Sequence, residues 1–344
     1  MSPLFPLLGL ILRDDAYGYV LKRIVQDEFA PHWRIDFAQL YRTLSKLEAQ
    51  GFVRARVGAS ADGPARKIYH ATARGKRAFE QWIQASAATH DEFWVKTRLA
   101  TALGYDADAL PLALVGSDDP LLAYAAQSAQ LAFQRVGSLA GLEALARRQA
   151  DIAGTHLRDA ETREYNLAFA QHLIPEEDIL LAQFAVREYG LLVARGNPKK
   201  IRGVRDLARR NARLLNRPHG AGARLWLYQH LRAARIDPQT LRGWENVAAT
   251  YNALAAALEQ DAADAAPGLR VTAEQQNLDF IALGEERFDL AIPRALYESA
   301  RVAKLFDQFQ SSAFRAYASA WRGYDISRLG RIVGESKFGY RRKT

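Results

Sequence analysis

The chain has 344 residues, of which 49% are hydrophobic and 25% are charged, so it can bury a sizeable core and form two or three folded domains. This composition excludes a disordered chain, and the absence of cysteine excludes disulfides, thiolate metal ligands and a cysteine nucleophile. The net charge of +9 permits a polyanionic partner without identifying one. A chain without cysteine suits a reducing compartment, and we expect a cytoplasmic location.

The chain begins with an apolar stretch, "MSPLFPLLGLILRDD". It lacks the basic start and the small-residue cleavage site of a signal peptide, and it is too short to span a bilayer. The stretch therefore predicts a core helix, and we expect no membrane partner.

Most of the excess positive charge lies between residues 34 and 77, where ten lysines and arginines accompany three acidic residues. A solvated basic surface would explain this charge. A surface that binds the phosphates of DNA would explain it equally well, so the shape of the segment has to decide.

The stretch "DFAQLYRTLSKLEAQGF" predicts a helix that begins after the N-cap Asp36 and ends at Gly51. Its buried stripe is expected to consist of Phe37, Leu40, Leu44 and Leu47. An earlier helix, "YGYVLKRIVQDEF", ends before Pro31, and two helices with a short connection are typical of a helix-turn-helix. The candidate DNA contacts on the exposed face are Gln39, Tyr41, Arg42, Ser45 and Lys46.

Two short strand candidates, "FVRARV" and "ARKIYHAT", flank the turn "GASADGP" and predict a β-hairpin. A hairpin beside the second helix forms a wing that places cations on the phosphates flanking a groove. Its candidate DNA contacts are Arg54, Arg56, Arg66 and Lys67. Each of these cations alone would be an ordinary solvated side chain, but helix, helix and hairpin in this order favour DNA binding.

These stretches resemble the PadR family of winged-helix regulators. The resemblance spans residues 5–85, through "LLGLILRDDAYGYVLKRI", "FAQLYRTLSKLEAQGFV" and "GPARKIYHATARGKRAFEQWI". It implies that residues 1–85 form an α+β winged-helix domain that binds double-stranded DNA, with the helix after Asp36 in the major groove. It also implies a homodimer, for which residues 86–110 and the helical stretches "RGKRAFEQWIQ" and "EFWVKTRLATALG" are the dimerisation candidates.

Residues 111–344 alternate short apolar runs with helical runs, which predicts an α/β domain with a mostly parallel sheet. Helices are expected over residues 119–132, at "SLAGLEALARRQ" and after "HGAGAR". The strand candidates are "LPLALVG", "ADIAG", "ILLAQFAVREYGLLVARG", "RLLN", "LDFIAL" and "FDLAIP".

Three glycine- or serine-rich turns precede helices in this domain: "GSDD" from Gly116, "GS" from Gly137 and "NRPHGAGAR" from Asn216. A helix N-terminus offers unpaired N–H groups and a partial positive charge, so each turn is a candidate anion site. Simple helix capping is the alternative for each turn alone, whereas three turns in one domain favour a shared ligand. The candidate ligand contacts are Ser117, Asp118, Ser138, His156, Tyr165, Asn166, Arg217, Gly220, Ala221, Gly222 and Arg224.

The C-terminal domain is similar to the periplasmic-binding-protein-like domain often fused to molybdopterin biosynthesis proteins, and to molybdate-binding proteins. The resemblance rests on "GSLAGLEALARRQADIAGTHLRDAETREYN", "REYGLLVARGNPKKIRGVRDLA", "LLNRPHGAGARLWLYQHL" and "FIALGEERFDLAIP". It implies two α/β lobes that close over a ligand in the cleft between them, with molybdate or tungstate as the effector. A small organic acid is the alternative effector.

The sequence contains no HExxH motif, no nucleophile elbow and no Walker loop, since "HGAGAR" lacks the Lys-Ser/Thr ending. We therefore expect no catalytic residue, no bound metal and no cofactor besides the effector anion. The hypothesis is a one-component transcription regulator that binds operator DNA as a dimer and senses a small anion. Its rivals are a transferase of molybdenum-cofactor biosynthesis and an architectural DNA-binding protein with an inactive cleft.

Overall fold

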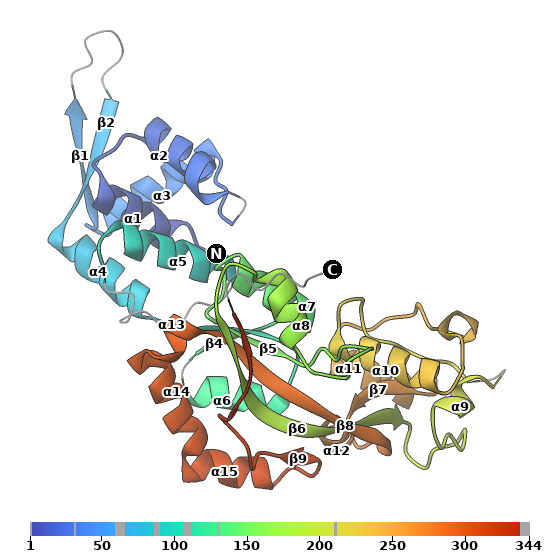
Figure 1. The fold of residues 1–344 in the computed structure, drawn as a ribbon. Helices are drawn as coiled ribbons and strands as arrows, with labels where there is room; N and C mark the ends of the chain where they lie inside the picture. The colour runs from blue at the N-terminus through green and yellow to red at the C-terminus, as the bar shows by residue number, and fades with distance from the viewer. Residues whose placement is uncertain are drawn as a thin grey trace. The chain divides into compact units, whose positions relative to one another are not determined.

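The computed structural model describes residues 2–30, 32–58, 66–85, 90–105, 112–129, 131–209 and 212–337. The chain divides into two compact units, Met1–Ala113 with Gln130–Ala132, and Leu114–Ala129 with Phe133–Thr344 (Figure 1). Each unit has its own hydrophobic core. The predicted domain boundary between residues 110 and 111 lies outside the described residues, as do residues 59–64 of the turn predicted at the tip of the hairpin.

The first unit combines helices with one two-stranded hairpin. Its elements are α1 (Leu4–Arg13), α2 (Gly18–Ile24), a π-helical turn (Val25–Phe29), α3 (Phe37–Ala49), β1 (Val53–Gly58), β2 (Arg66–Ala71), α4 (Ala73–Gln84) and α5 (His90–Ala102). All five α-helices contribute buried residues to one core cluster. The predicted N-terminal core helix is α1, whose residues 6–11 are buried. Within the described ranges, no helix is long and apolar enough to cross a membrane.

Helix α3 has the predicted start and end. The Asp36 carboxylate accepts a hydrogen bond from the backbone N–H of Gln39 at 2.7 Å, and Gly51 adopts a φ of +69°. The prediction that Phe37 belongs to the buried stripe is wrong, because Phe37 is 42% exposed. Thr43 is buried instead. Side chains on a helix lean toward its N-terminus, so the first residue of α3 extends past the edge of the core.

The hairpin pairs β1 and β2 in antiparallel register, with Arg54 opposite His70 and Arg56 opposite Ile68. Because side chains alternate between faces, Arg54 and Arg56 share one face of the hairpin. Lys67 pairs with Val57 and therefore lies on the other face. The wing thus carries cations on both faces.

The second unit is an α/β body built on one sheet. After α5 the helices are α6 (Pro120–Ser128), α7 (Ser138–Ala146), α8 (Leu167–Leu173), α9 (Val204–Leu207), α10 (Gly222–Ala233), α11 (Tyr251–Glu259), α12 (Arg270–Gln275), α13 (Arg294–Tyr297), α14 (Ala300–Gln310) and α15 (Ser312–Ser319). The strands are β3 (Ala113–Gly116), β4 (Ala132–Arg135), β5 (Ile152–Thr155), β6 (Ile179–Val193), β7 (Ala266–Leu269), β8 (Asp279–Pro293), β9 (Tyr324–Asp325) and β10 (Ile332–Ser336).

In the described part of the chain, eight strands form one mixed sheet in the order β10-β6-β8-β5-β3-β4, with β7 and β9 paired to β6. β3 and β5 are parallel, but β8 is antiparallel to both β5 and β6, and β7 and β10 are antiparallel to β6. The expectation of a mostly parallel sheet is therefore wrong. The polar residues "GEER" interrupt the apolar pattern and predict two separate strands, whereas "LDFIAL" and "FDLAIP" lie in or beside one 15-residue strand, β8.

Strands β6 and β8 run side by side along the second unit (Figure 1). At one end, Ile179 of β6 packs in a core cluster with Leu142 of α7, which we call the first lobe. Toward the other end, Leu191 of β6 packs in a cluster with Leu227 of α10, which we call the second lobe. The two long strands therefore connect two lobes with separate cores.

Two smaller expectations also differ from the structure. Helix α6 ends at Ser128, and Ala132, its expected last residue, is the first residue of β4. The expected strand "RLLN" forms only isolated bridges, from Leu214 and Asn216.

Candidate functional site

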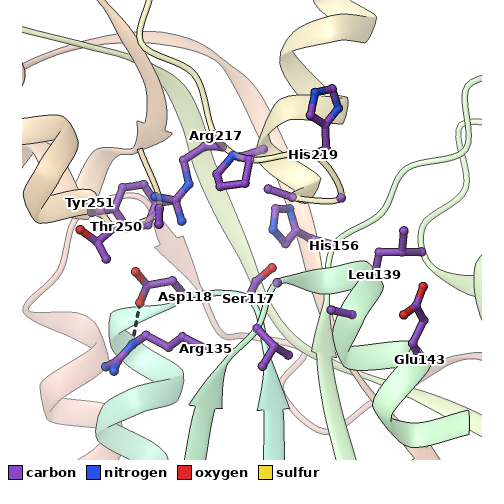
Figure 2. A pocket seen from close by; sticks show the side chains of 18 residues that line it. Ser117, Asp118, Arg135, Leu139, Glu143, His156, Arg217, His219, Thr250 and Tyr251 are labelled. Carbon is purple, nitrogen blue, oxygen red and sulfur yellow. Dashed lines mark ion pairs between the residues drawn. The ribbon is translucent and has the colours of Figure 1, made fainter. Parts of the chain in front are cut away.

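A pocket of about 400 Å³ lies in the second unit (Figure 2). Its volume is within the range of roughly 300–1,000 Å³ that is typical of small-molecule sites. The pocket is lined by Ser117, Asp118, Arg135, Val136, Gly137, Leu139, Ala140, Glu143, His156, Arg217, Pro218, His219, Gly220, Ala221, Ala223, Ala249, Thr250 and Tyr251.

The three turns singled out in the sequence all reach this pocket. Ser117 and Asp118 follow β3, Gly137 is the N-cap of α7, and residues 217–221 precede α10. The beginning of α11 also lies at the pocket, through Thr250 and Tyr251. Thr250 caps this helix by accepting a hydrogen bond from the N–H of Ala253 at 3.2 Å. Helices α7, α10 and α11 thus begin at the pocket, and the first N–H groups of a helix have no acceptor four residues earlier within it.

Ser117, Ser138 and His156 form a hydrogen-bonded group beside the pocket. The two serine Oγ atoms lie 2.7 Å apart, and Ser138 Oγ accepts from the backbone N–H of His156 at 3.2 Å. Ser117 and His156 line the pocket, whereas Ser138 is fully buried and does not. Ser138 therefore lies behind the pocket lining, where its hydrogen bonds orient Ser117 and His156.

A buried chain of charges supports His156. Its Nδ1 lies 2.8 Å from Glu286, which also accepts from Arg187. Arg187 in turn donates to Asp119 at 2.8 Å. Burial by itself would raise the pKa of Glu286, but the charges of Arg187 and His156 outweigh burial and lower it. Because an ionised carboxylate can only accept, Nδ1 of His156 carries a hydrogen.

Arg217 brings a positive charge into the pocket lining. It is 7% exposed, donates to the Ala248 carbonyl at 3.4 Å and lies 4.5 Å from the centre of the Tyr251 ring. Among the described residues, its side chain has no carboxylate at ion-pair distance. Burial raises the pKa of Tyr251 to about 12, so its phenol stays protonated and can donate a hydrogen bond.

Tyr165 and Asn166 lie outside the pocket lining. The buried Asn166 amide accepts from the N–H of Leu157 at 2.7 Å and donates to Asp289 at 2.8 Å. The Tyr165 carbonyl accepts from Arg287 at 3.2 Å. Both residues stabilise the turn that precedes α8.

Gly222 and Arg224, at the start of α10, are also absent from the lining. A Cβ at Gly222 would come within 2.6 Å of the His156 ring, so glycine allows α10 to approach β5 closely. Arg224 points away, because it donates to Glu245 at 2.9 Å and lies over the Trp244 ring at 4.6 Å. It lines a second, more apolar pocket of about 410 Å³.

Six of the predicted ligand contacts therefore line the first pocket: Ser117, Asp118, His156, Arg217, Gly220 and Ala221. Sequence reasoning missed Thr250 and Tyr251, although "TYNALAAALE" shows the signal of an N-cap threonine before an apolar helix. It also missed Arg135, for which the sequence pattern offers no signal.

The chemical groups at the pocket suit an anion. The groups that favour an anion are N–H groups at three helix starts, the Ser117 hydroxyl and the Arg217 guanidinium, and the carboxylates of Asp118 and Glu143 also line the pocket. In the ranges that the structure describes, no group of three or more His, Asp or Glu side chains is placed to hold a metal ion.

The first unit exposes most of the candidate DNA contacts. Tyr41 is 50% exposed, and Gln39 is half-buried. The other exposed candidates are Arg42, Ser45, Lys46, Arg54, Arg56 and Lys67. The Lys67 ammonium lies 3.8 Å from the Glu48 carboxylate, and the side chain of Arg66 lies outside the described residues. Sequence reasoning missed Tyr19, which is 59% exposed and stacks near Phe37 beside Tyr41.

Residues 7–81 match the transcriptional regulator PadR-like family, and residues 121–310 match the PBP superfamily domain. The protein YvgK of Bacillus subtilis is 30% identical over 200 residues, which cover 58% of this chain and 64% of YvgK. The negative transcriptional regulator PadR of Bacillus subtilis is 25% identical over 103 residues, which cover 29% of this chain and 57% of that protein. The chain thus spans less than two thirds of the length of either relative.

Among solved structures, an ABC-type phosphate transport receptor from Vibrio cholerae matches 62% of this chain and 98% of its own, with 12% identity and a TM-score of 0.41. The family assignment comes from the sequence matches, of which the longer covers more than half of the chain. The chain therefore belongs to the PBP superfamily domain family over residues 121–310, and it carries a PadR-like domain over residues 7–81.

Proposed function

We propose that this protein is a transcription regulator whose PadR-like domain binds operator DNA and whose PBP domain senses a small anion. The observation that carries the proposal is the pocket at which α7, α10 and α11 all begin, with Arg217 in its lining. Helix N-termini supply N–H donors and partial positive charge, and arginine adds a full charge. Such a set of groups is complementary to an anion.

The basic face of the first unit supports DNA binding. Arg42 and Lys46 on α3 and Arg54 and Arg56 on β1 are exposed. A helix of this kind fits the major groove, while the cations of an adjacent hairpin reach the flanking phosphates. A homodimer would present two such faces to two half-sites, and α4 and α5 are our candidates for the dimer contact.

Two classes of anion are candidates for the effector. Molybdate and tungstate are the inorganic candidates, and they suit neutral N–H donors at helix starts. A small organic acid is the second candidate, favoured by the pocket volume of about 400 Å³, which has room for more atoms than a tetrahedral oxyanion contains. In either case the anion acts as a signal if it binds the DNA-competent and DNA-incompetent states with different affinity.

The anion half of the proposal is tested by thermal unfolding of the full chain with molybdate, tungstate, sulfate, phosphate and small carboxylates. At least one of these anions should raise the melting temperature in a concentration-dependent manner. Arg217→Gln should weaken binding of that anion about 10- to 100-fold, because a hydrogen bond to a charged group is lost. Arg232→Gln, at an exposed position on α10, is the matched control and should bind like wild type.

The DNA half is tested with Arg42→Ala combined with Lys46→Ala, and a duplex selected from a randomised library. Binding should weaken at least about tenfold, with a salt dependence shallower by about two released ions. The control pair Arg232→Ala with Lys304→Ala removes the same charge from exposed positions of the second unit. Loss of anion binding in the α3 variant, with DNA binding unchanged, would contradict the division of labour between the two units.

A further inference from the structure

Asp118 and Glu143 each place a carboxylate in the lining of a pocket whose donor groups suit an anion, and Glu143 pairs with Arg147 at 3.5 Å. Asp119, which follows Asp118, is fully buried, where it caps α6 through the N–H of Leu122 and pairs with Arg187. Asp118 does neither, because its side chain is 22% exposed and lines the pocket. The two adjacent aspartates of "GSDD" thus have separate roles.

The Asp118 carboxylate is only partly neutralised. Its Oδ1 lies 2.7 Å from Nε of Arg135, whose own side chain is 55% exposed. An ion pair of that exposure contributes little, since solvent screens it. Among the described residues, Arg135 is the one hydrogen-bond or ion-pair partner that the structure records for the Asp118 carboxylate. With a single recorded partner, the carboxylate retains capacity to accept a further hydrogen bond from a ligand.

Arg217 and Asp118 come from different lobes and face the same space. Arg217 precedes α10 of the second lobe, whereas Asp118 follows β3 of the first. In Figure 2 the Arg217 guanidinium is directed toward the part of the pocket that holds Asp118, whose carboxylate is joined to Arg135. Arg217 and Asp118 are not within ion-pair distance, so a ligand placed between them would meet a cation on one side and an acceptor on the other.

This arrangement discriminates between two kinds of anion. Sulfate, molybdate and tungstate at neutral pH have acceptor oxygens only, so they satisfy Arg217 but bring negative charge against Asp118. An anion with its own O–H or N–H group turns that group to Asp118 and its charge to Arg217. An acceptor that loses water when a ligand binds and gains no donor in return is costly, which increases the difference between the two kinds.

We propose that the pocket selects ligands in which an anionic group is accompanied by a hydrogen-bond donor, and that Asp118 is the residue that accepts a hydrogen bond from this donor. The chemical class comprises 2-hydroxy and 2-amino carboxylates and a protonated oxyanion such as hydrogen phosphate. The proposal rests on the anion-sensing function above and specifies its ligand. It also gives Asp118 a part in lobe closure, because the ligand bridges a residue of each lobe.

The test is titration calorimetry of the full chain with matched anions at neutral pH. Glycolate and glycine carry donors that acetate lacks, and hydrogen phosphate carries a hydrogen that sulfate, molybdate and tungstate lack. We expect the donor-bearing member of at least one set to bind ten or more times tighter than its partner. The comparison of glycolate and glycine with acetate tests organic ligands. The comparison of hydrogen phosphate with sulfate, molybdate and tungstate tests inorganic ligands.

Asp118→Asn should reduce that ratio several-fold, because an amide can donate to an acceptor-only ligand. Asp307→Asn, at an exposed position on α14, should leave the ratio unchanged. The wild-type ratios suffice as a test if Asp118→Asn does not fold. Equal or tighter binding of the donor-free anions by wild type overturns this proposal and leaves anion sensing intact, as does an unchanged ratio in folded Asp118→Asn. Binding of none of these anions would count against the proposed function itself.

Discussion

Asp289 is a carboxylate whose charge state is set by its place in the first lobe. It is fully buried on β8, where it accepts hydrogen bonds from Asn166 and Arg287. Burial raises its pKa to about 6, despite the opposing effect of these two partners. The unfolded chain would ionise the same group near its ordinary value of 3.8.

This difference predicts a pH dependence of stability. Between about pH 4 and pH 6 the folded state holds the proton that the unfolded state has lost, so stability falls as the pH rises through this window. Relative to Asp289→Asn, wild type should lose up to about 3 kcal/mol of unfolding free energy across it. Urea denaturation at several pH values measures the difference, and Asp307→Asn is the control. A difference between wild type and Asp289→Asn that does not change with pH would contradict this expectation.

Gly222 gives a second prediction at the residue scale. A Cβ at this position would lie 2.6 Å from the ring of His156, which is buried and hydrogen-bonded to Glu286 and would have to shift. Gly222→Ala should therefore lower the unfolding free energy by about 1–3 kcal/mol and weaken anion binding. Gly203→Ala is the control, since nothing lies within 4 Å of its added Cβ. Equal stability of the two variants in urea denaturation would show that the close approach is not required.

At the scale of elements, β6 and β8 join the two lobes through a buried ion pair. Arg187 and Glu286 are direct partners in the register of the two strands. The pairing is irregular on both sides of them, between Gln183 and Ala185 and between Tyr189 and Gly190. The ion pair therefore lies in a short regular stretch between two irregularities, at the junction of the lobes.

Removing one member of this pair should be costly. Arg187→Met leaves the buried Asp119 without a cation and leaves the buried Glu286 with His156 alone, so we expect a loss of about 3–5 kcal/mol of unfolding free energy. Arg270→Met removes a comparable pair with Glu188, whose side chains are 23% and 27% exposed, and should cost about 1 kcal/mol or less. Urea denaturation of both variants makes the comparison. Similar losses would show that burial does not distinguish the two pairs.

Sequence patterns predicted element starts better than element ends and pairings. Asp36 was recognisable as an N-cap because its carboxylate satisfies a local N–H, and that contact depends on neighbouring residues alone. Strand β8 was not recognisable as one element, because its polar centre is paired and partly buried by β6, more than ninety residues away. The predicted burial of Phe37 was wrong for a related reason. The edge of a core is decided by packing against distant residues, which the helical spacing of α3 does not contain.

At the scale of the whole molecule, the proposal joins a DNA-binding unit to an anion-binding unit. Coupling between two sites is reciprocal, so an anion that changes DNA affinity by a given factor has its own affinity changed by the same factor in the presence of DNA. We expect equal factors, on the order of 5- to 150-fold.

The anion that stabilises the protein most and a library-selected duplex provide the two probes. DNA affinity is measured with and without saturating anion, and anion affinity with and without saturating DNA. Arg217→Gln should abolish the effect of the anion on DNA affinity without changing DNA affinity itself. If the anion does not change DNA affinity and DNA does not change anion affinity, the two units bind their ligands independently, which would contradict the proposed coupling.

The sequence by itself determined the two families, the helix-turn-helix with its wing, and the three turns at helix starts, because these depend on local spacing, capping and charge. The tertiary structure decided which candidates meet. It brought Ser117, Asp118 and Arg217 to one pocket, turned Arg224 toward Glu245, and placed Ser138 and Asn166 behind the lining. These outcomes depend on β6 and β8 holding two lobes together, and pairing between distant segments leaves no periodic signal in the sequence.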